Sequence, residues 1–336
     1  MSEGWGDFTA LLVCARAGDN FAGTYGTGGY VGRTYSVDSH YFGLRRYPYS
    51  TDMTKNPLTF KHIQDGVPLP AGVPTLPSGA PNSEHHNAGE IWATMLWECY
   101  AALLKDNGRL SFAAAQDRML SYVVAGYKLT PPDATFTEAR DALLLAAYLN
   151  DPADFQLFTQ AFAKRGMGLK AVAPPRDSQS NSGLVEDFNT GGGLEFVSAV
   201  LDDSVQSCDN DGVLDNGETG RLTITLRNTG WASLTATTVA VTSATPGVSF
   251  PNGATINFPT SGWGGQGAAS LPVKLTGQVG IQTASFNISY NDPGLALPGP
   301  FGASYQVQVN LDNVSQSTAT DDVEVSANAA LWTVSR

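Results

Sequence analysis

The spacing of hydrophobic and polar residues changes once along the chain and divides it into two parts. Within residues 1–166, apolar residues recur every three to four positions, which is the spacing of one helix face. We predict five helices here, over residues 4–17, over residues 89–105, and from Ser111, Thr135 and Pro152 onward. The last two have local start signals, because Thr135 and Glu138 form a capping box and Asp151 precedes Pro152.

Beyond residue 192 the apolar residues alternate with polar ones, as they do in half-buried strands. Gly, Asn and Pro residues separate the alternating runs and favour turns. The runs cover residues 194–201, 221–228, 237–244, 269–276, 282–290 and 305–311. Short strands at this spacing predict an all-β sandwich of immunoglobulin-like type.

The boundaries follow from these patterns and from two irregular stretches. Residues 18–84 are rich in Gly, Tyr, Pro and Ser, and such a long irregular segment in a compact domain predicts a functional surface. Pro, Ser and Asn give residues 169–192 the composition of a linker. We therefore predict a helical lobe, a linker, a β-sandwich and the truncated start of a further segment, over residues 1–168, 169–192, 193–312 and 313–336.

Composition excludes several classes of function. A formal net charge of −12 argues against nucleic acid or an anionic membrane as a partner. No apolar run reaches the roughly 20 residues of a membrane span. The three cysteines form no C-x-x-C motif, and we expect Cys14 and Cys99 to be buried thiols in helices. We predict no signal peptide, because residue 1 already lies within a motif.

The first helix contains two carboxylates, Glu3 and Asp7, that its period places on one face. One carboxylate can bind zinc while the other orients a histidine ligand through its second nitrogen. The same spacing is also common on solvated helix surfaces, so on its own it leaves both interpretations open. Gly4 and Gly6 favour the first, since two glycines near a helix start are unfavourable unless close packing requires them.

Five segments in the first half, in this order, carry a family resemblance. They are MSEGWGDF, LRRYPYSTDMTKNPLTF, HHNAGEIWATMLWE, FTEARDALLLA and FTQAFAKRGMG. Together they resemble the fungalysin family of zinc metallopeptidases. The resemblance implies the mainly helical C-terminal lobe of a thermolysin-like peptidase, a secreted and extracellular enzyme, a Zn²⁺ cofactor and protein or peptide substrates.

The resemblance also implies roles for individual residues. Glu3 matches the third protein ligand of the catalytic zinc, and Asp7 matches the carboxylate that orients one zinc-bound histidine. His86 matches the histidine that hydrogen-bonds the oxyanion as water attacks the peptide carbonyl, with His85 as the alternative. Arg45 matches an arginine that binds a substrate carbonyl beside the scissile bond, although the next residue is also an arginine.

The chain departs from the family in one respect that decides its activity. It contains no H-E-x-x-H, the motif that supplies two zinc ligands and the general base. We expect this motif upstream, so the missing N-terminal peptidase segment is an implied partner and the chain alone is predicted to be inactive. The alternative is a non-catalytic extracellular binding or adhesion protein that carries a relic lobe.

The segment SCDNDGVLDNGE, residues 207–218, fits a twelve-residue calcium loop. Ser207 occupies the first position, where an aspartate is usual, and Gly212 occupies the sixth. An acidic turn that forms without metal is the alternative. The predicted calcium ligands are Asp209, Asp211, the Val213 carbonyl, Asp215 and Glu218.

Two tryptophans of the second part have two open interpretations. Trp231 follows an Asn228-Thr229-Gly230 turn, and Trp263 lies in a glycine-rich stretch. Exposed aromatic side chains at these places would contact a polymeric substrate. Packing into a core is the other use, and we expect it for at least one of the two.

Overall fold

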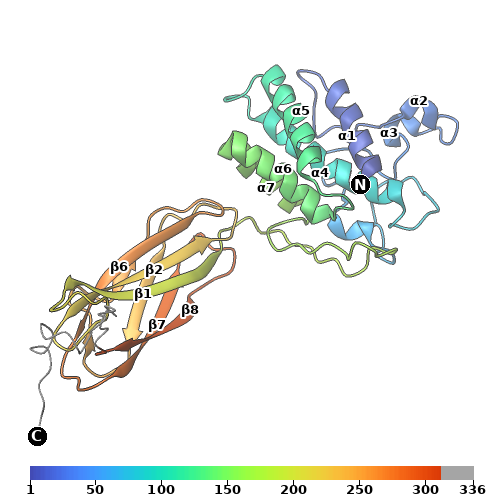
Figure 1. Cartoon of the computed structure of the whole chain (residues 1–336). Coiled ribbons are helices and arrows are strands. Elements are labelled where there is room, and N and C mark those ends of the chain that lie inside the picture. The colour runs from blue at the N-terminus through green and yellow to red at the C-terminus, as the bar shows by residue number, and fades with distance from the viewer. Residues whose placement is uncertain (312–336) are drawn as a thin grey trace, which may run out of the picture.

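The computed structural model describes residues 1–311, so the predicted segment 313–336 lies outside the described residues. The described chain has helices in its N-terminal part and antiparallel sheets in its C-terminal part (Figure 1). This confirms the predicted order of a helical lobe followed by an all-β part.

All five predicted helices are present, and three short helical turns lie between them. The long helices are α1 (Ser2–Cys14), α4 (His85–Lys105), α5 (Phe112–Leu129), α6 (Phe136–Asn150) and α7 (Pro152–Lys164). The short ones are α2 (Gly29–Gly32), α3 (Ser39–Phe42) and η1 (Phe60–Ile63). Helix α4 begins four residues earlier than predicted because the Glu84 carboxylate caps it, accepting hydrogen bonds from the amides of His86 and Asn87.

Helix α4 forms the centre of the lobe. Its side chains are buried almost continuously from Asn87 to Leu103, and Trp92 and Trp97 are fully buried. Helices α1 and α7 pack against it, and α5 and α6 pack against each other. Cys99 is buried as predicted, but Cys14 is exposed, because it lies off the buried face of α1 to which Leu11 and Leu12 belong.

Buried polar bonds attach the irregular segments to this core. The guanidinium of Arg165 is fully buried and binds Glu98 of α4. It also donates to the carbonyls of Ser50, Asn56 and Leu58, so one side chain fixes much of the segment before η1. Residues 167–192 also lie on the lobe, because the backbone amides of Lys61 and Asp65 donate to the Glu186 carboxylate and the Ser180 carbonyl.

The β part consists of two four-stranded antiparallel sheets. One has the order β1 (Leu194–Gln206), β2 (Thr219–Asn228), β6 (Gln266–Leu275), β4 (Val248–Ser249). The other has the order β5 (Thr255–Asn257), β3 (Thr238–Ser243), β7 (Gln282–Asn291), β8 (Phe301–Val309). Alternating side chains such as Leu222, Ile224 and Phe286 form a common core. The two strands that the sequence pattern missed, β4 and β5, are too short to show a period.

Both tryptophans of the β part pack against the helical lobe. Trp231 is 3% exposed and belongs to the core cluster of the lobe, where the guanidinium of Arg140 lies 4.9 Å from its ring centre. Trp263 is half-buried and stacks on Phe155 of α7 at 4.9 Å. The prediction of core packing is therefore confirmed, and Trp231 is not available to a polymer.

Candidate functional site

The close crossing of α1 and α4 positions the candidate site. A Cβ added at Gly4 would lie 2.1 Å from the carbonyl oxygen of Gly89, so the two backbones touch. The crossing places Glu3 of α1 beside His86 of α4, with 3.4 Å between Oε2 and Nε2. Gly4, which the sequence pattern indicated as a close-packing position, thus allows the approach that brings Glu3 to His86. Gly6 has no such neighbour.

Asp7 lies one turn along α1 and is bound by two side chains from the segment that follows α3. Arg45 donates to both of its oxygens, from Nε at 2.5 Å and from Nη2 at 2.9 Å. The Tyr49 hydroxyl donates to Oδ2 of the same carboxylate. Burial, and then the nearby charge of Asp7, raise the pKa of Tyr49 well above 10.0, so the phenol stays protonated.

The bonds to Asp7 also keep the Arg45 guanidinium protonated. Burial acts to lower the pKa of Arg45, but the hydrogen bonds and charges of Asp7 and Tyr49 together outweigh it and raise the pKa. Glu3 lies near the same guanidinium, with 3.8 Å between Nη2 and Oε2. No hydrogen bond within residues 1–311 uses Nη1, so this end of the guanidinium has donors available for a ligand.

Glu84 connects the helix cap to the histidine pair. Its Oε1 lies 2.7 Å from Nδ1 of His86 and 2.9 Å from Nδ1 of His85, while Oε2 accepts the His86 amide. Partial burial acts to raise the pKa of Glu84, but the hydrogen bonds from His86 and Asn87 outweigh it and lower the pKa. The carboxylate thereby orients the His86 ring with Nε2 toward Glu3.

A buried pair lies next to these groups. Glu90, 1% exposed, accepts the backbone amide of Arg46 and has 3.3 Å between its Oε1 and Nε of Arg46. The Arg46 guanidinium also donates to Asn82 and to the Asn87 carbonyl. Arg46 is therefore committed to internal bonds, and Arg45 is the arginine that faces the site.

Donors suited to a metal come together at the open edge of the site. Atoms of Glu3, His85 and His86 all lie within 4.8 Å of one another. Zinc accepts carboxylate and imidazole donors, so Glu3 at this edge can contribute one ligand to a zinc site. Glu3 and His86 are 39% and 45% exposed, which leaves both reachable from outside.

The structure brings together the five residues predicted from the sequence, which are Glu3, Asp7, Arg45, His85 and His86. Tyr49, Glu84 and Glu90 also lie at the site but were not predicted from the sequence. The Y-P-Y-S match contains Tyr49, but nothing local in the sequence pairs a phenol with a carboxylate 42 positions earlier. The available signal for Glu84 was an acidic residue just before the helix start, because negative side chains are favoured at the positive end of the helix dipole.

The acidic loop of the β part forms a second cluster. Metal-ligating atoms of Asp209 and Asp211 lie within 4.8 Å of an oxygen of Asp203, a buried residue of β1 that the loop pattern did not include. Glu218 is 4% exposed and accepts the amides of Cys208 and Asp215. Its carboxylate therefore closes the loop on itself.

Comparisons with known proteins address the helical part. A model of the fungalysin metallopeptidase family (M36) matches residues 1–171, and that family is zinc-dependent in general. The extracellular metalloproteinase mep of Aspergillus terreus is 33% identical over 183 residues, which are 51% of this chain and 25% of that protein. Extracellular metalloproteinase 1 of Arthroderma otae is 31% identical over 188 residues, 53% of this chain and 26% of that protein.

The chain thus spans about a quarter of the length of these relatives. A solved structure titled for AvmM, which catalyses macrocyclization in alchivemycin A biosynthesis, is 12% identical. It covers 39% of this chain and 94% of that one with a TM-score of 0.22, which is too low to support an argument. No helix in the described part of the chain is long and apolar enough to cross a membrane. The family model covers half of the residues, and the chain belongs to the fungalysin metallopeptidase family.

Proposed function

We propose that residues 1–168 are the C-terminal lobe of the catalytic domain of a secreted zinc endopeptidase, and that they supply one side of its active site. The observation that supports this most is the meeting of Glu3, Asp7, Arg45 and His86 at one crossing of two helices. The relatives are named extracellular metalloproteinases, and we infer extracellular proteolysis for this chain from its similarity to them.

In this proposal Glu3 holds the zinc, with two further ligands supplied by the H-E-x-x-H segment that the chain lacks. When bound, zinc supplies an acidified water and polarises the substrate carbonyl. Asp7 has three hydrogen bonds from Arg45 and Tyr49, and a carboxylate can accept about four. The remaining acceptor position is suited to the distal nitrogen of a histidine ligand.

His86 and Arg45 act on the substrate in the same proposal. When its ring carries both protons, His86 donates from Nδ1 to Glu84 and presents Nε2 to a developing oxyanion. Arg45 offers Nη1 to a substrate carbonyl while Asp7 fixes its plane. The chain has neither the general base nor the other two ligands, so we expect no hydrolysis by these 336 residues alone.

A longer protein that contains an in-frame H-E-x-x-H upstream of residue 1 tests the catalytic proposal. It should cleave casein in a chelator-sensitive way. Glu3→Ala should lower the cleavage rate by at least about 10²-fold, because a zinc ligand is lost. Glu195→Ala, on an exposed strand of the β part, is the matched control and should cleave normally. Normal cleavage by Glu3→Ala would disprove the ligand assignment.

A genuine translation start at residue 1, with no such motif before it, would instead favour the second candidate. In that case the lobe is a relic, and the protein binds extracellular material without hydrolysing it.

We further propose that the β part, residues 193–312, is an immunoglobulin-like accessory domain with a calcium site at its acidic loop. The clustering of Asp203, Asp209 and Asp211 supports oxygen ligation of a hard cation. Titration calorimetry of the chain with millimolar calcium should release heat, and Asp211→Ala should abolish it. Glu195→Gln should leave the heat unchanged, and equal heats for all three proteins would exclude the site.

A further inference from the structure

The two histidines at the start of α4 lie side by side, although they are consecutive residues of a helix. Consecutive side chains of a helix point about 100° apart and do not usually face each other. Here Oε1 of Glu84 lies 2.9 Å from Nδ1 of His85 and 2.7 Å from Nδ1 of His86, and the two ring centres are 4.1 Å apart. One carboxylate therefore holds both imidazoles together.

The bond to Glu84 also determines which nitrogen of His86 can bind a metal. A histidine that ligates a metal usually donates its other ring N–H to a carboxylate, which fixes its tautomer. When Nδ1 of a neutral His86 donates to Glu84, the lone pair is on Nε2, the nitrogen beside Glu3. The carboxylate that orients His86 thus also prepares it as a ligand.

The distances suit a tetrahedral ion. Zinc lies about 2.0–2.1 Å from nitrogen and oxygen ligands, so two of its ligands are about 3.3–3.4 Å apart. Oε2 of Glu3 and Nε2 of His86 are 3.4 Å apart. Ligand atoms of Glu3, His85 and His86, one from each residue, lie within 4.8 Å of one another. The His85 side chain is 66% exposed, so it can rotate to close the remaining gap.

The charges around the three residues favour a cation. With both imidazoles neutral, Glu3, Asp7 and Glu84 carry three negative charges, and Arg45 carries one positive charge that is bound to Asp7. The excess of negative charge attracts a divalent ion. The tight crossing of α1 and α4 holds the carboxylate of one helix against the imidazole of the other before any metal arrives.

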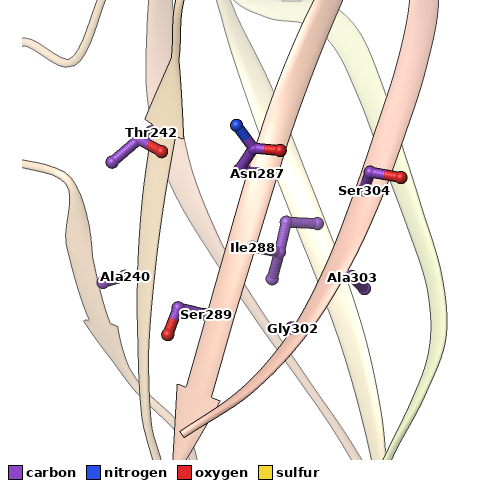
Figure 2. Close-up of a pocket in the computed structure, with 8 residues that line it drawn as sticks. All are labelled: Ala240, Thr242, Asn287, Ile288, Ser289, Gly302, Ala303 and Ser304. Atoms are coloured by element: carbon purple, nitrogen blue, oxygen red, sulfur yellow. The ribbon is translucent and has the colours of Figure 1, made fainter.

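Other hollows and clusters of the described chain offer different chemistry. Figure 2 shows a shallow depression of about 510 Å³ on strands β3, β7 and β8. Side chains such as Thr242, Asn287 and Ser304 line it, with no carboxylate, imidazole or thiol among its described residues. The acidic loop offers carboxylate oxygens, which suit calcium, whereas imidazole nitrogens suit zinc, copper and nickel.

We propose that Glu3, His85 and His86 form a site for a divalent transition-metal ion that lies wholly within this chain, with water as the fourth ligand. It differs from the zinc site that would need the H-E-x-x-H segment, because the two sites share only Glu3. The ligand set does not depend on peptidase activity, and the site forms equally well if the lobe is a relic.

Titration calorimetry of the 336-residue chain with zinc chloride tests this site, in excess calcium so that the acidic loop is saturated. One zinc ion should bind. Glu3→Gln, His85→Gln and His86→Gln should each raise the dissociation constant about tenfold or more, because each removes a ligand. Zinc should also raise the melting temperature of the parent, and by less in His85→Gln. Melting without zinc checks that each variant is folded.

Two variants serve as controls and should bind zinc like the parent. His40→Gln removes an exposed imidazole outside the cluster, and Cys208→Ser removes the thiol of the acidic loop. A parent chain that binds no zinc overturns the proposal, as does parent-like binding by His85→Gln. Loss of zinc binding in Cys208→Ser would place the ion in the loop and also overturn it. The chain contains no H-E-x-x-H, so none of these results depends on the catalytic proposal.

Discussion

Glu90, a buried residue next to the site, makes the stability of the protein depend on pH. Burial raises the pKa of Glu90 from 4.5 to about 7, against the opposing charge of Arg46. A raised folded-state pKa gives stability that is fully present below 4.5 and lost as the pH rises through about 7. We therefore expect the free energy of unfolding to lose on the order of 3 kcal/mol across this window through Glu90.

Glu90→Gln should remove this dependence, because a neutral amide keeps the acceptor for the Arg46 backbone amide without titrating. Chemical denaturation of the parent and the variant at several pH values measures the difference. Glu195→Gln is the control and should follow the parent. Parallel profiles for the parent and Glu90→Gln would contradict the effect of burial.

The sequence can predict a residue's chemistry more readily than its partners. Glu3 and Asp7 share a helix face through local geometry, so their relation is readable four positions apart. The bonds from Arg45 and Tyr49 to Asp7 join positions 38 and 42 residues apart, and no period connects them. The family resemblance gave Arg45 a role toward substrate, but its bidentate bond to Asp7 required the fold.

Helix packing provides a prediction at the scale of elements. Gly4→Ala would force a methyl group against the Gly89 carbonyl and push α1 away from α4, at a cost of about 1–3 kcal/mol. Gly6→Ala, two residues further on, meets no atom within 4 Å and should stabilise α1 by about 0.5–1 kcal/mol. Thermal unfolding of both variants measures the contrast. Equal stability changes would mean that the crossing is not tight.

Local signals explain which elements were predictable. The Thr135–Glu138 capping box and the Asp151 cap before Pro152 both form as expected, since each uses residues within one helical turn. Helix α4 began earlier than predicted because its polar first turn has no apolar period. The composition of residues 169–192 gave no sign that Val172 and Val185 bridge each other, because no local period joins two residues 13 positions apart in an irregular segment.

At the scale of the whole molecule, the contact between the helical lobe and the β part depends on a few aromatic side chains. Trp263 stacks on Phe155 with 11° between the ring planes and meets Tyr148 edge-on at 5.4 Å. The Trp231 carbonyl accepts a hydrogen bond from Gln156 of α7. Two domains move relative to each other unless their interface is large and hydrophobic. We therefore expect these contacts to limit the motion of the β part relative to the helical lobe.

Trp263→Ala should therefore loosen the two parts without unfolding either of them. It removes both ring contacts, each worth about 0.5–1.5 kcal/mol beyond the buried area. Small-angle scattering should show a broader distribution of interatomic distances for this variant than for the parent. Trp263→Phe retains an aromatic ring at the stack and should scatter like the parent. If Trp263→Ala also scatters like the parent, then Trp231 and its neighbours hold the parts together alone, and the stack has no role in their orientation.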